Sequence, residues 1–267
     1  MKLTYLGTAA AEGCPAIFCR CETCREARRL GGKDIRTRSQ ALVNDDLLID
    51  LPADTYAHFL ENGIEGDAIR YLLLTHAHSD HLYPAELQMR AEVYAHDKRV
   101  PVLAVYCSEY VAARIGRAPA NTAVTVLEPY KTVELGDYRV TPLPARHEEG
   151  AFIYLIEGER TLLYAHDTGY PFPEVTDYLA KRGVTLDLIS LDCTNVDIPV
   201  PDDGRHMGLL NIGRLLTHLR TCGVVTEETA VYINHFSHNA RPLHERLLAL
   251  AAPLGYGVAY DGLCVTL

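Results

Sequence analysis

Short apolar runs recur along the whole chain and alternate with stretches of helical periodicity. Most runs are rich in β-branched or aromatic residues and are bounded by Gly, Asp, Asn or Pro, a pattern typical of β-strands. The pattern predicts strands at residues 3–6, 41–43, 47–49, 71–74, 102–106, 123–127, 138–142, 152–156, 161–164, 186–191, 230–233 and 257–259.

Between these runs, hydrophobic residues recur at the spacing of amphipathic helices. A Gly-Gly pair ends the first helical stretch, and Asp54 is a candidate N-cap for the second. The predicted helices span residues 21–31, 53–62, 83–91, 108–115, 173–182, 207–221 and 242–252. Because no linker, repeat or composition break interrupts the pattern, we expect residues 1–267 to form a single α/β domain with layered sheets and helices outside.

Composition, net charge and the N-terminal residues argue against several classes of protein. The chain has 267 residues, 48% of them hydrophobic and 22% charged, which is typical of a folded globular protein. A net charge of −10 gives no overall basic field that would attract nucleic acid or an anionic membrane. The apolar start is interrupted at Thr4, Tyr5 and Gly7, so it indicates a strand rather than an export signal. We therefore expect a cytoplasmic protein with reduced thiols and no membrane contact.

The eight cysteines fall into two groups. Four are scattered singly in apolar surroundings, where we expect small buried hydrophobic residues: Cys107, Cys193, Cys222 and Cys264. The others cluster as Cys19, Cys21 and Cys24, with Cys14 just upstream. Three soft thiolates favour Zn²⁺, and a closed structural zinc site needs a fourth ligand. Reactive or redox thiols are the alternative.

The strongest chemical signal is L-L-L-T-H-A-H-S-D-H, where an apolar strand ends at Thr75. Alternate residues of an extended chain point the same way, so His76 and His78 can converge on one metal ion. Asp80 and His81 come after the turn and can reach a second ion. Imidazole and carboxylate suit Zn, Mn or Fe. The alternative, a polar loop that is rich in His by accident, explains this density of ligands poorly.

This motif resembles the T-H-x-H-x-D-H signature of the metallo-β-lactamase fold superfamily. The resemblance implies a four-layer αββα sandwich and a dinuclear centre whose further ligands follow later strands, in P-L-P-A-R-H, L-L-Y-A-H-D-T-G and V-Y-I-N-H-F-S-H. It implies one ion on His76, His78 and His147, a second on Asp80, His81 and His235, and Asp167 as the bridge. Two such ions would activate a shared water for hydrolysis. Asp50 matches the family's earlier aspartate, which supports the histidine loop.

Residues around the motifs resemble one branch, the phosphoribosyl cyclic phosphodiesterases of the carbon–phosphorus lyase pathway, which are related to the tRNA 3′-processing phosphodiesterases. The similar stretches are L-G-T-A-A-A-E-G-C-P-A, C-x-C-x-x-C, Asp192-Cys193 and N-H-F-S-H. The resemblance implies a phosphodiesterase for a small cyclic phosphodiester, such as a phosphoribosyl 1,2-cyclic phosphate or a cyclic nucleotide. Asp80 and His206 are then the predicted catalytic residues, with His206 as a proton donor to the leaving alkoxide.

The same branch implies that His238 completes a structural zinc site with Cys19, Cys21 and Cys24, and Cys14 is the competing fourth ligand. The expected partner is a small phosphorylated substrate rather than a polynucleotide, because the long tRNA-gripping arm of the relatives is missing. Whether the chain forms a homodimer stays open. The candidates for binding a terminal phosphate are Arg146, Arg205 and Arg241, although an exposed arginine is the commoner explanation of each.

Other functions remain as alternatives. One is the hydrolysis of another ester, or a step in cofactor biosynthesis of the pyrroloquinoline-quinone type, whose member has a similar H-M-G stretch and cysteine cluster. Flavodiiron chemistry fits poorly, because those proteins place an acidic residue at His78 and carry an additional flavodoxin domain. A non-enzymatic metal sensor is the third alternative. Among the other histidines, His166 should point away from the site, and we expect solvated side chains at His58, His96, His218 and His244.

Overall fold

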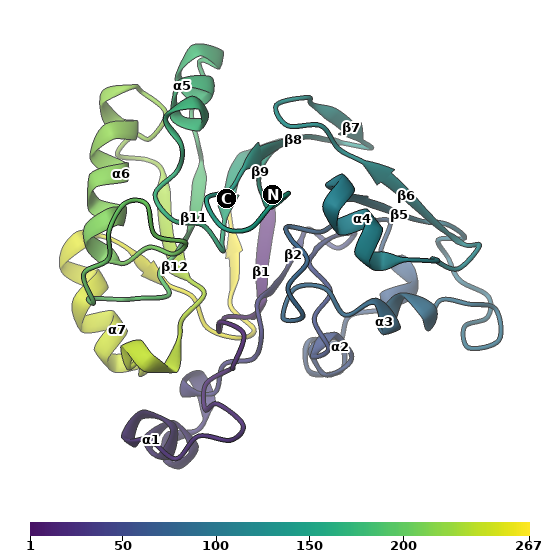
Figure 1. Cartoon of the computed structure of the whole chain (residues 1–267), viewed down its shortest axis with the longest axis horizontal. Helices are drawn as coiled ribbons and strands as arrows, with labels where there is room; N and C mark the ends of the chain where they lie inside the picture. Colours follow the sequence, from purple (N-terminus) through teal and green to yellow (C-terminus); the bar gives the residue numbers. More distant parts are fainter.

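Two mixed β-sheets face each other in the computed structural model, which describes residues 1–267, and helices cover their outer faces (Figure 1). The first sheet has the order β14-β1-β2-β3-β4-β5-β6. Its strands are β1 (Lys2–Gly7), β2 (Gln40–Val43), β3 (Leu47–Ile49), β4 (Tyr71–Leu73), β5 (Leu103–Cys107), β6 (Thr122–Val126) and β14 (Cys264–Thr266).

The second sheet has the order β13-β12-β11-β10-β9-β8-β7. Its strands are β7 (Val133–Leu135), β8 (Tyr138–Pro144), β9 (Phe152–Glu157), β10 (Thr161–Ala165), β11 (Leu188–Asp192), β12 (Ala230–Asn234) and β13 (Gly257–Val258). The arrangement confirms the predicted αββα sandwich of the metallo-β-lactamase type.

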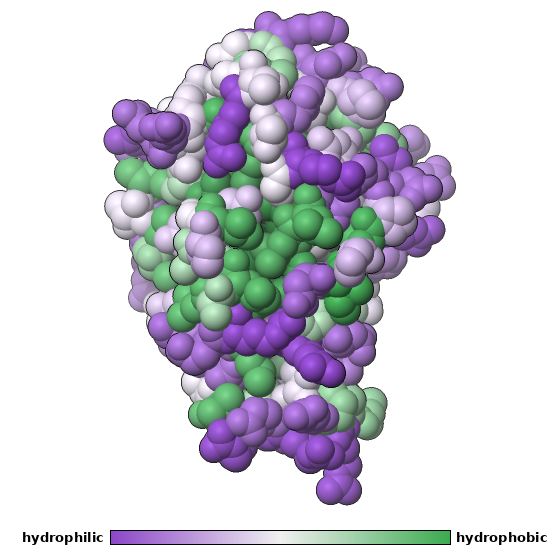
Figure 2. All heavy atoms as spheres, turned by 90° about the vertical axis from the view of Figure 1, so that its left-hand side faces the viewer, coloured by the Kyte–Doolittle hydropathy of each residue, from purple (hydrophilic) through white to green (hydrophobic).

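The helices divide between the two outer faces, with α1 projecting from the lower end of the molecule (Figure 1). They are α1 (Glu22–Leu30), α2 (Thr55–Asn62), α3 (Pro84–Gln88), α4 (Glu109–Ile115), α5 (Pro173–Arg182), α6 (Leu209–Thr221) and α7 (His244–Ala251). Helices α2 to α4 lie beside the first sheet and α5 to α7 beside the second. Figure 2 shows an apolar area on the face that α6 and α7 cover, and these helices carry the exposed Leu210 and Leu248. No helix combines the length and the apolar character needed to cross a membrane.

Buried side chains form a layer between the sheets and one layer under each set of helices. Strand β11 is buried along its whole length, as expected for a parallel strand covered on both faces. Tyr5 of β1 reaches across the central layer, and its hydroxyl lies 2.7 Å from Ser190 Oγ on β11. The second sheet also holds the start of the histidine loop, because Tyr154 Oη donates to the carbonyl of Leu74 at 2.6 Å.

Every strand and helix predicted from the sequence has a counterpart, with differences of a few residues at the ends. The short edge strands β7 and β14 were not predicted, because each has only three residues, too few for a pattern to stand out. Asp54 is the N-cap residue of α2, but its side chain makes no capping bond; it binds Arg38 at 2.9 Å instead.

Two of the histidines expected to be solvated are buried. His58 lies 1% exposed, with Nε2 2.7 Å from Thr37 Oγ1 and Nδ1 2.7 Å from Gln40 Oε1. His244 is 6% exposed at the start of α7. The prediction was wrong because a helical context does not reveal which helix face packs inward. His96 and His218 are exposed, as expected.

Two of the four scattered cysteines were also predicted wrongly. Cys107 and Cys193 are buried, but Cys222 and Cys264 are exposed. Cys222 follows the last turn of α6, and Cys264 begins the edge strand β14. Both lie at the ends of elements, where apolar neighbours in the sequence do not guarantee burial.

Candidate metal centre

The candidate ligands collect at one edge of the sandwich, where strands end. In the second sheet β10, β11 and β12 are parallel, so Asp167, Asp192 and His235 emerge side by side at their carboxyl ends. In the first sheet β3 and β4 are parallel, which places Asp50 beside the start of the histidine loop. The residues Asp50, Asp167 and His235 have φ values of 68°, 50° and 61°. Such left-handed backbone is unfavourable for residues other than glycine and clusters at functional sites.

Three histidines form the first half of the site. His78 Nδ1 lies 3.0 Å from His76 Nε2 and 3.1 Å from His147 Nε2. The three rings approach edge-on, with interplanar angles of 81° and 82°, so their nitrogens face one central point. These are the three residues that the sequence grouped around one ion.

Asp80, His81 and His235 form the second half of the site, and all three are buried. Asp167 lies between the halves. Its Oδ2 is 2.7 Å from both His81 Nε2 and His235 Nε2, while its Oδ1 is 3.5 Å from His147 Nε2. A carboxylate in this position can contact two ions at once, as expected of a bridging ligand.

The hydrogen bonding of the candidate ligand atoms indicates that they suit divalent cations. His81 Nε2, His235 Nε2 and Asp167 Oδ2 are buried, and none of them makes a hydrogen bond, although Asp167 Oδ2 lies 2.7 Å from each of the two nitrogens. Buried polar atoms normally have a hydrogen-bond partner, because leaving one unpaired is costly. Here the lone pairs converge on shared points instead, which is the arrangement of metal ligands.

A second polar partner holds each of the five histidines in orientation. His81 Nδ1 lies 2.7 Å from Asp50 Oδ2 and His235 Nδ1 2.8 Å from Thr194 Oγ1. The other partners are Thr75 Oγ1 for His76, the Arg205 carbonyl for His147 and Glu148 Oε2 for His78. Such partners fix which ring nitrogen faces a metal ion. His78 presents Nδ1 inward, whereas the other four present Nε2.

Asp50 lies where the sequence placed it. Its fully buried carboxylate accepts hydrogen bonds from the Thr75 backbone N–H at 2.8 Å and from Thr75 Oγ1 at 2.9 Å, besides facing His81 Nδ1. Burial raises the pKa of Asp50, although these partners oppose the shift. Its contacts tie β3 to the first residue of the histidine loop.

The sequence matches the family described as "Beta-lactamase superfamily domain" over residues 48–236, well over half of the chain. The chain belongs to this family. Together with the donor set, membership makes the protein a metal-dependent hydrolase of the metallo-β-lactamase superfamily with a dinuclear metal-binding fold. No curated protein matches the sequence.

Solved structures of this superfamily resemble the whole chain. A diphosphatase of the PhnP family has a TM-score of 0.75 and 22% identity, covering 100% of this chain and 97% of its own. Zn²⁺-bound PqqB from Methylobacterium extorquens has a TM-score of 0.68 and 18% identity, with 100% of both chains covered. Human tRNase Z, short form, has a TM-score of 0.65 and 14% identity, covering 100% of this chain and 99% of its own. At these identities the likeness shows the fold alone.

His206 lies at the rim of the metal centre. Its Nδ1 is 3.0 Å from Asp192 Oδ2 and 4.0 Å from Asp167 Oδ1, and its ring stacks parallel to His235 at 5.7 Å. Burial alone would lower the pKa of His206, but the carboxylates of Asp192 and Asp167 outweigh burial and raise the pKa. Asp192 therefore fixes the orientation of the His206 ring beside the site.

Sequence reasoning missed the functional positions of Asp192 and Glu148. Asp192 is fully buried and accepts hydrogen bonds from the backbone N–H groups of Thr194 and Met207 at 3.1 and 3.0 Å. Glu148 accepts from the Ala77 N–H at 2.8 Å and lies 3.3 Å from His78 Nε2. Each carried a signal in the sequence, Asp192 at the end of a buried strand and Glu148 directly after His147.

The three candidate phosphate-binding arginines stay predictions and differ in their contacts. Arg146 donates through Nε to the Tyr170 carbonyl at 2.8 Å and lies over the Phe172 ring at 4.2 Å, so packing already holds its guanidinium. Arg205 and Arg241 are exposed. His166 lies outside the donor set, as expected, with Nε2 2.7 Å from Ser190 Oγ.

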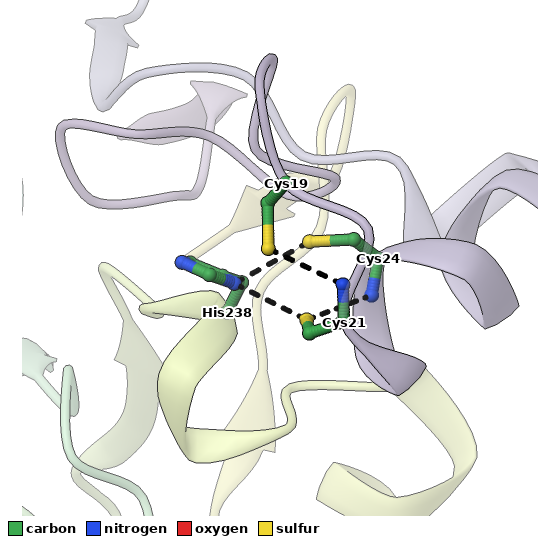
Figure 3. Close-up of side chains that lie close together, drawn as sticks. All are labelled: Cys19, Cys21, Cys24 and His238. Atoms are coloured by element: carbon green, nitrogen blue, oxygen red, sulfur yellow. Dashed lines mark hydrogen bonds between the residues drawn. The ribbon is translucent and has the colours of Figure 1, made fainter.

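The cysteine cluster meets His238 in space (Figure 3). His238 Nδ1 lies 3.3 Å from Cys24 Sγ and 3.6 Å from Cys21 Sγ, and Cys19 completes a group whose ligand atoms all lie within 4.8 Å of one another. Cys14 is buried and does not belong to the group. The backbone N–H of Cys24 lowers the pKa of Cys21 to about 6, which favours the thiolate that binds metal.

Proposed function

We propose that the protein is a dinuclear-metal phosphodiesterase that hydrolyses a small cyclic phosphodiester, such as a phosphoribosyl 1,2-cyclic phosphate or a cyclic nucleotide. The observation that carries the proposal is the pair of His206 and Asp192 beside the donor set. A ring-opening phosphodiesterase must protonate an alkoxide leaving group, and a histidine outside the metal ligands is free to do so. The fold shared with a PhnP-family diphosphatase and with tRNase Z supports the same reaction class.

In this proposal His76, His78 and His147 hold one ion, Asp80, His81 and His235 hold the other, and Asp167 bridges them. The donor set suits Zn²⁺ or Mn²⁺. Two bound ions would lower the pKa of a water molecule and offset the charge that develops on the phosphate oxygens. Asp50 and Glu148 keep the histidines in the orientation that such ions require.

His206 supplies the proton. Its Nδ1–H donates to Asp192 Oδ2, so the protonated ring has a second N–H, at Nε2, that can be given to the leaving oxygen. The Asp192 carboxylate is itself held in place, because its other oxygen accepts hydrogen bonds from the backbone N–H groups of Thr194 and Met207. The buried carboxylate thus fixes the ring and stabilises its positive charge.

We also propose a structural Zn²⁺ on Cys19, Cys21, Cys24 and His238, with the whole chain acting as one domain on a small phosphorylated substrate in the cytoplasm. The compact donor group supports the zinc. The acidic net charge of −10 supports a small substrate over a polynucleotide, whose phosphates a basic surface would bind.

The test compares two leaving groups. Protein loaded with Zn²⁺ or Mn²⁺ is assayed on bis-p-nitrophenyl phosphate, whose nitrophenolate leaves without a proton, and on 2′,3′-cyclic nucleotides, whose alkoxide needs one. Asp80→Ala should abolish turnover of both. His206→Ala should lose roughly 10²–10⁴-fold on the cyclic nucleotides and far less on the nitrophenyl ester.

Absence of phosphodiester turnover by the metal-loaded protein would overturn the proposal. Full activity of His206→Ala on the cyclic substrate would remove the role of His206 alone. The second candidate is a cofactor-biosynthesis hydrolase, favoured by the fold shared over full length with PqqB. Turnover of a carboxylic ester or lactone panel without phosphodiester cleavage would select it.

A further inference from the structure

Asp50 orients the candidate ligand His81, and its own backbone has a conformation that needs support. The φ of Asp50 is 68°, in the left-handed region that a residue with a Cβ rarely adopts. Its backbone N–H donates to the Leu73 carbonyl at 2.8 Å, and its carboxylate faces Thr75 and His81. The carbonyl of Asp50 accepts no backbone hydrogen bond. Because Asp50 is fully buried, a side chain has to satisfy this carbonyl.

Gln40 of β2 supplies the donor. Its amide Nε2 lies 2.9 Å from the Asp50 carbonyl and 2.9 Å from Thr55 Oγ1 at the start of α2. Strands β2 and β3 pair antiparallel with Ala41 opposite Ile49. This register brings the next residues, Gln40 and Asp50, side by side. Gln40 is fully buried, which is uncommon for an amide side chain and indicates that its hydrogen bonds matter there.

His58 of α2 fixes the orientation of the Gln40 amide. A carbonyl oxygen can only accept, so the amide NH₂ must face Asp50 and Oε1 must face the other way. There His58 Nδ1 lies 2.7 Å from Gln40 Oε1. Burial lowers the pKa of His58 to about 4, so the ring is neutral and carries its one proton on Nδ1, toward Oε1. Hydrogen bonds therefore connect α2, through Gln40 and Asp50, to the candidate ligand His81.

We propose that Gln40 and His58 are positioning residues of the metal centre, which act through Asp50. Gln40 keeps Asp50 in its left-handed conformation, in which the carboxylate meets His81 Nδ1 at 2.7 Å. Without the amide donor the Asp50 carbonyl would be buried and unpaired, and its backbone would relax toward a less strained conformation. The carboxylate would then turn away from His81, which holds the second ion in the proposed ligand set on which this inference rests. Partners behind a metal ligand typically change metal affinity by roughly 10–100-fold.

Titration with Mn²⁺, followed by electron paramagnetic resonance, tests the proposal. Mn²⁺ prefers harder ligands than the thiolates of the cysteine cluster, so it reports on the dinuclear centre. Gln40→Met removes the amide but keeps an unbranched chain, and it should weaken the binding of one of the two ions at least about tenfold. His58→Leu should act in the same direction with a smaller loss, because the Gln40 donor remains, and it carries the test if Gln40→Met does not fold.

Thr55→Val is the matched control. It removes the other partner of Gln40 Nε2 and leaves the bond to Asp50 in place. This variant should lose stability in urea unfolding but bind both Mn²⁺ ions like the wild type. An effect on metal affinity that merely follows lost stability would appear in Thr55→Val as well.

A double-mutant cycle tests whether the effect passes through Asp50. Once Asp50→Ala has removed the carboxylate, Gln40→Met should cause no further loss of Mn²⁺ affinity. Unchanged affinity in Gln40→Met, an equal loss in Thr55→Val, or additive losses in the cycle would overturn the proposal. The proposed function fails on a different result: two bound Mn²⁺ without phosphodiester turnover would overturn it and leave the roles of Gln40 and His58 intact.

Discussion

Replacing Asp192 by asparagine gives the sharpest test of the proposed proton donor. The substitution preserves shape, removes the charge and replaces the acceptor oxygen Oδ2 by an NH₂ donor. Asp192 Oδ1 accepts from two backbone N–H groups, so the amide oxygen must take that position. The amide NH₂ then faces His206 Nδ1, which lies 3.0 Å from Oδ2 in the native protein. A donor there forces the neutral tautomer of His206 with its proton on Nε2 and disfavours the protonated ring.

The expected loss of kcat follows from the role of the Asp192 carboxylate in keeping His206 protonated. General acid catalysis contributes roughly 10²–10⁴-fold, so we expect kcat on a 2′,3′-cyclic nucleotide to fall about 10²-fold, a barrier increase of about 2.7 kcal/mol. Hydrogen bonds to a charged group contribute about 1.5–3 kcal/mol each. Because the backbone bonds to Oδ1 survive, the free energy of unfolding should fall by only about 1–3 kcal/mol.

Steady-state kinetics with both leaving groups, together with urea unfolding, measures these effects. Asp197→Asn is the matched control, because Asp197 lies five residues later, is 44% exposed and pairs only with Arg246. The control should match the wild type on both substrates. Equal losses of kcat by Asp192→Asn on bis-p-nitrophenyl phosphate and on the cyclic nucleotide would refute proton donation and leave Asp192 a structural role.

Three further predictions test the surroundings of the site. Glu148→Gln places an amide beside His78 Nε2 and should weaken metal binding about 10–100-fold in a chelator competition, whereas exposed Glu149→Gln should not. A Cβ on Gly169 would overlap the Gly204 carbonyl, so Gly169→Ala should displace the loop that carries His206. We expect kcat to fall at least about tenfold, and an unchanged kcat would contradict this close approach. Burial raises the pKa of Asp261 to about 6, above its unfolded value of 3.8. Its contribution to stability is therefore present below pH 4 and is lost as the pH rises through 6, by at most about 3 kcal/mol. Urea unfolding of Asp261→Asn should show a smaller fall across that window, and identical pH profiles would refute the assignment.

The sequence predicted the parts of the site that depend on strand ends. Histidine and aspartate residues that directly follow apolar runs can be recognised as candidate metal ligands, because parallel strands bring their carboxyl ends to one edge of a sheet. Asp192 also ends an apolar run, but the sequence does not show that Asp192 and Glu148 orient histidines. A single carboxylate beside a motif shows its role only when the histidine it orients is placed in space, as with Glu148 and His78.

The proposed structural zinc would link the N-terminal cysteines to the loop that carries the candidate ligand His235. His235 and His238 lie three residues apart, and the Phe236 N–H and carbonyl bond to the Thr8 carbonyl and the Ala10 N–H at 3.0 Å. Zinc on His238 and the cysteines would therefore fix the loop that carries His235. Cys24 and His238 are 214 positions apart, and a zinc ion that binds them only in the folded protein stabilises that state by its own binding free energy.

His238→Ala should therefore remove one zinc per chain, lower the melting temperature and reduce turnover through His235. Cys14→Ala is the control and should keep its zinc, because Cys14 lies outside the ligand group. Zinc analysis after selective removal of the active-site ions measures the difference. Zinc retained in His238→Ala but lost in Cys14→Ala would make Cys14 the fourth ligand, and the N-terminal loop would then have no metal link to the wall of the active site.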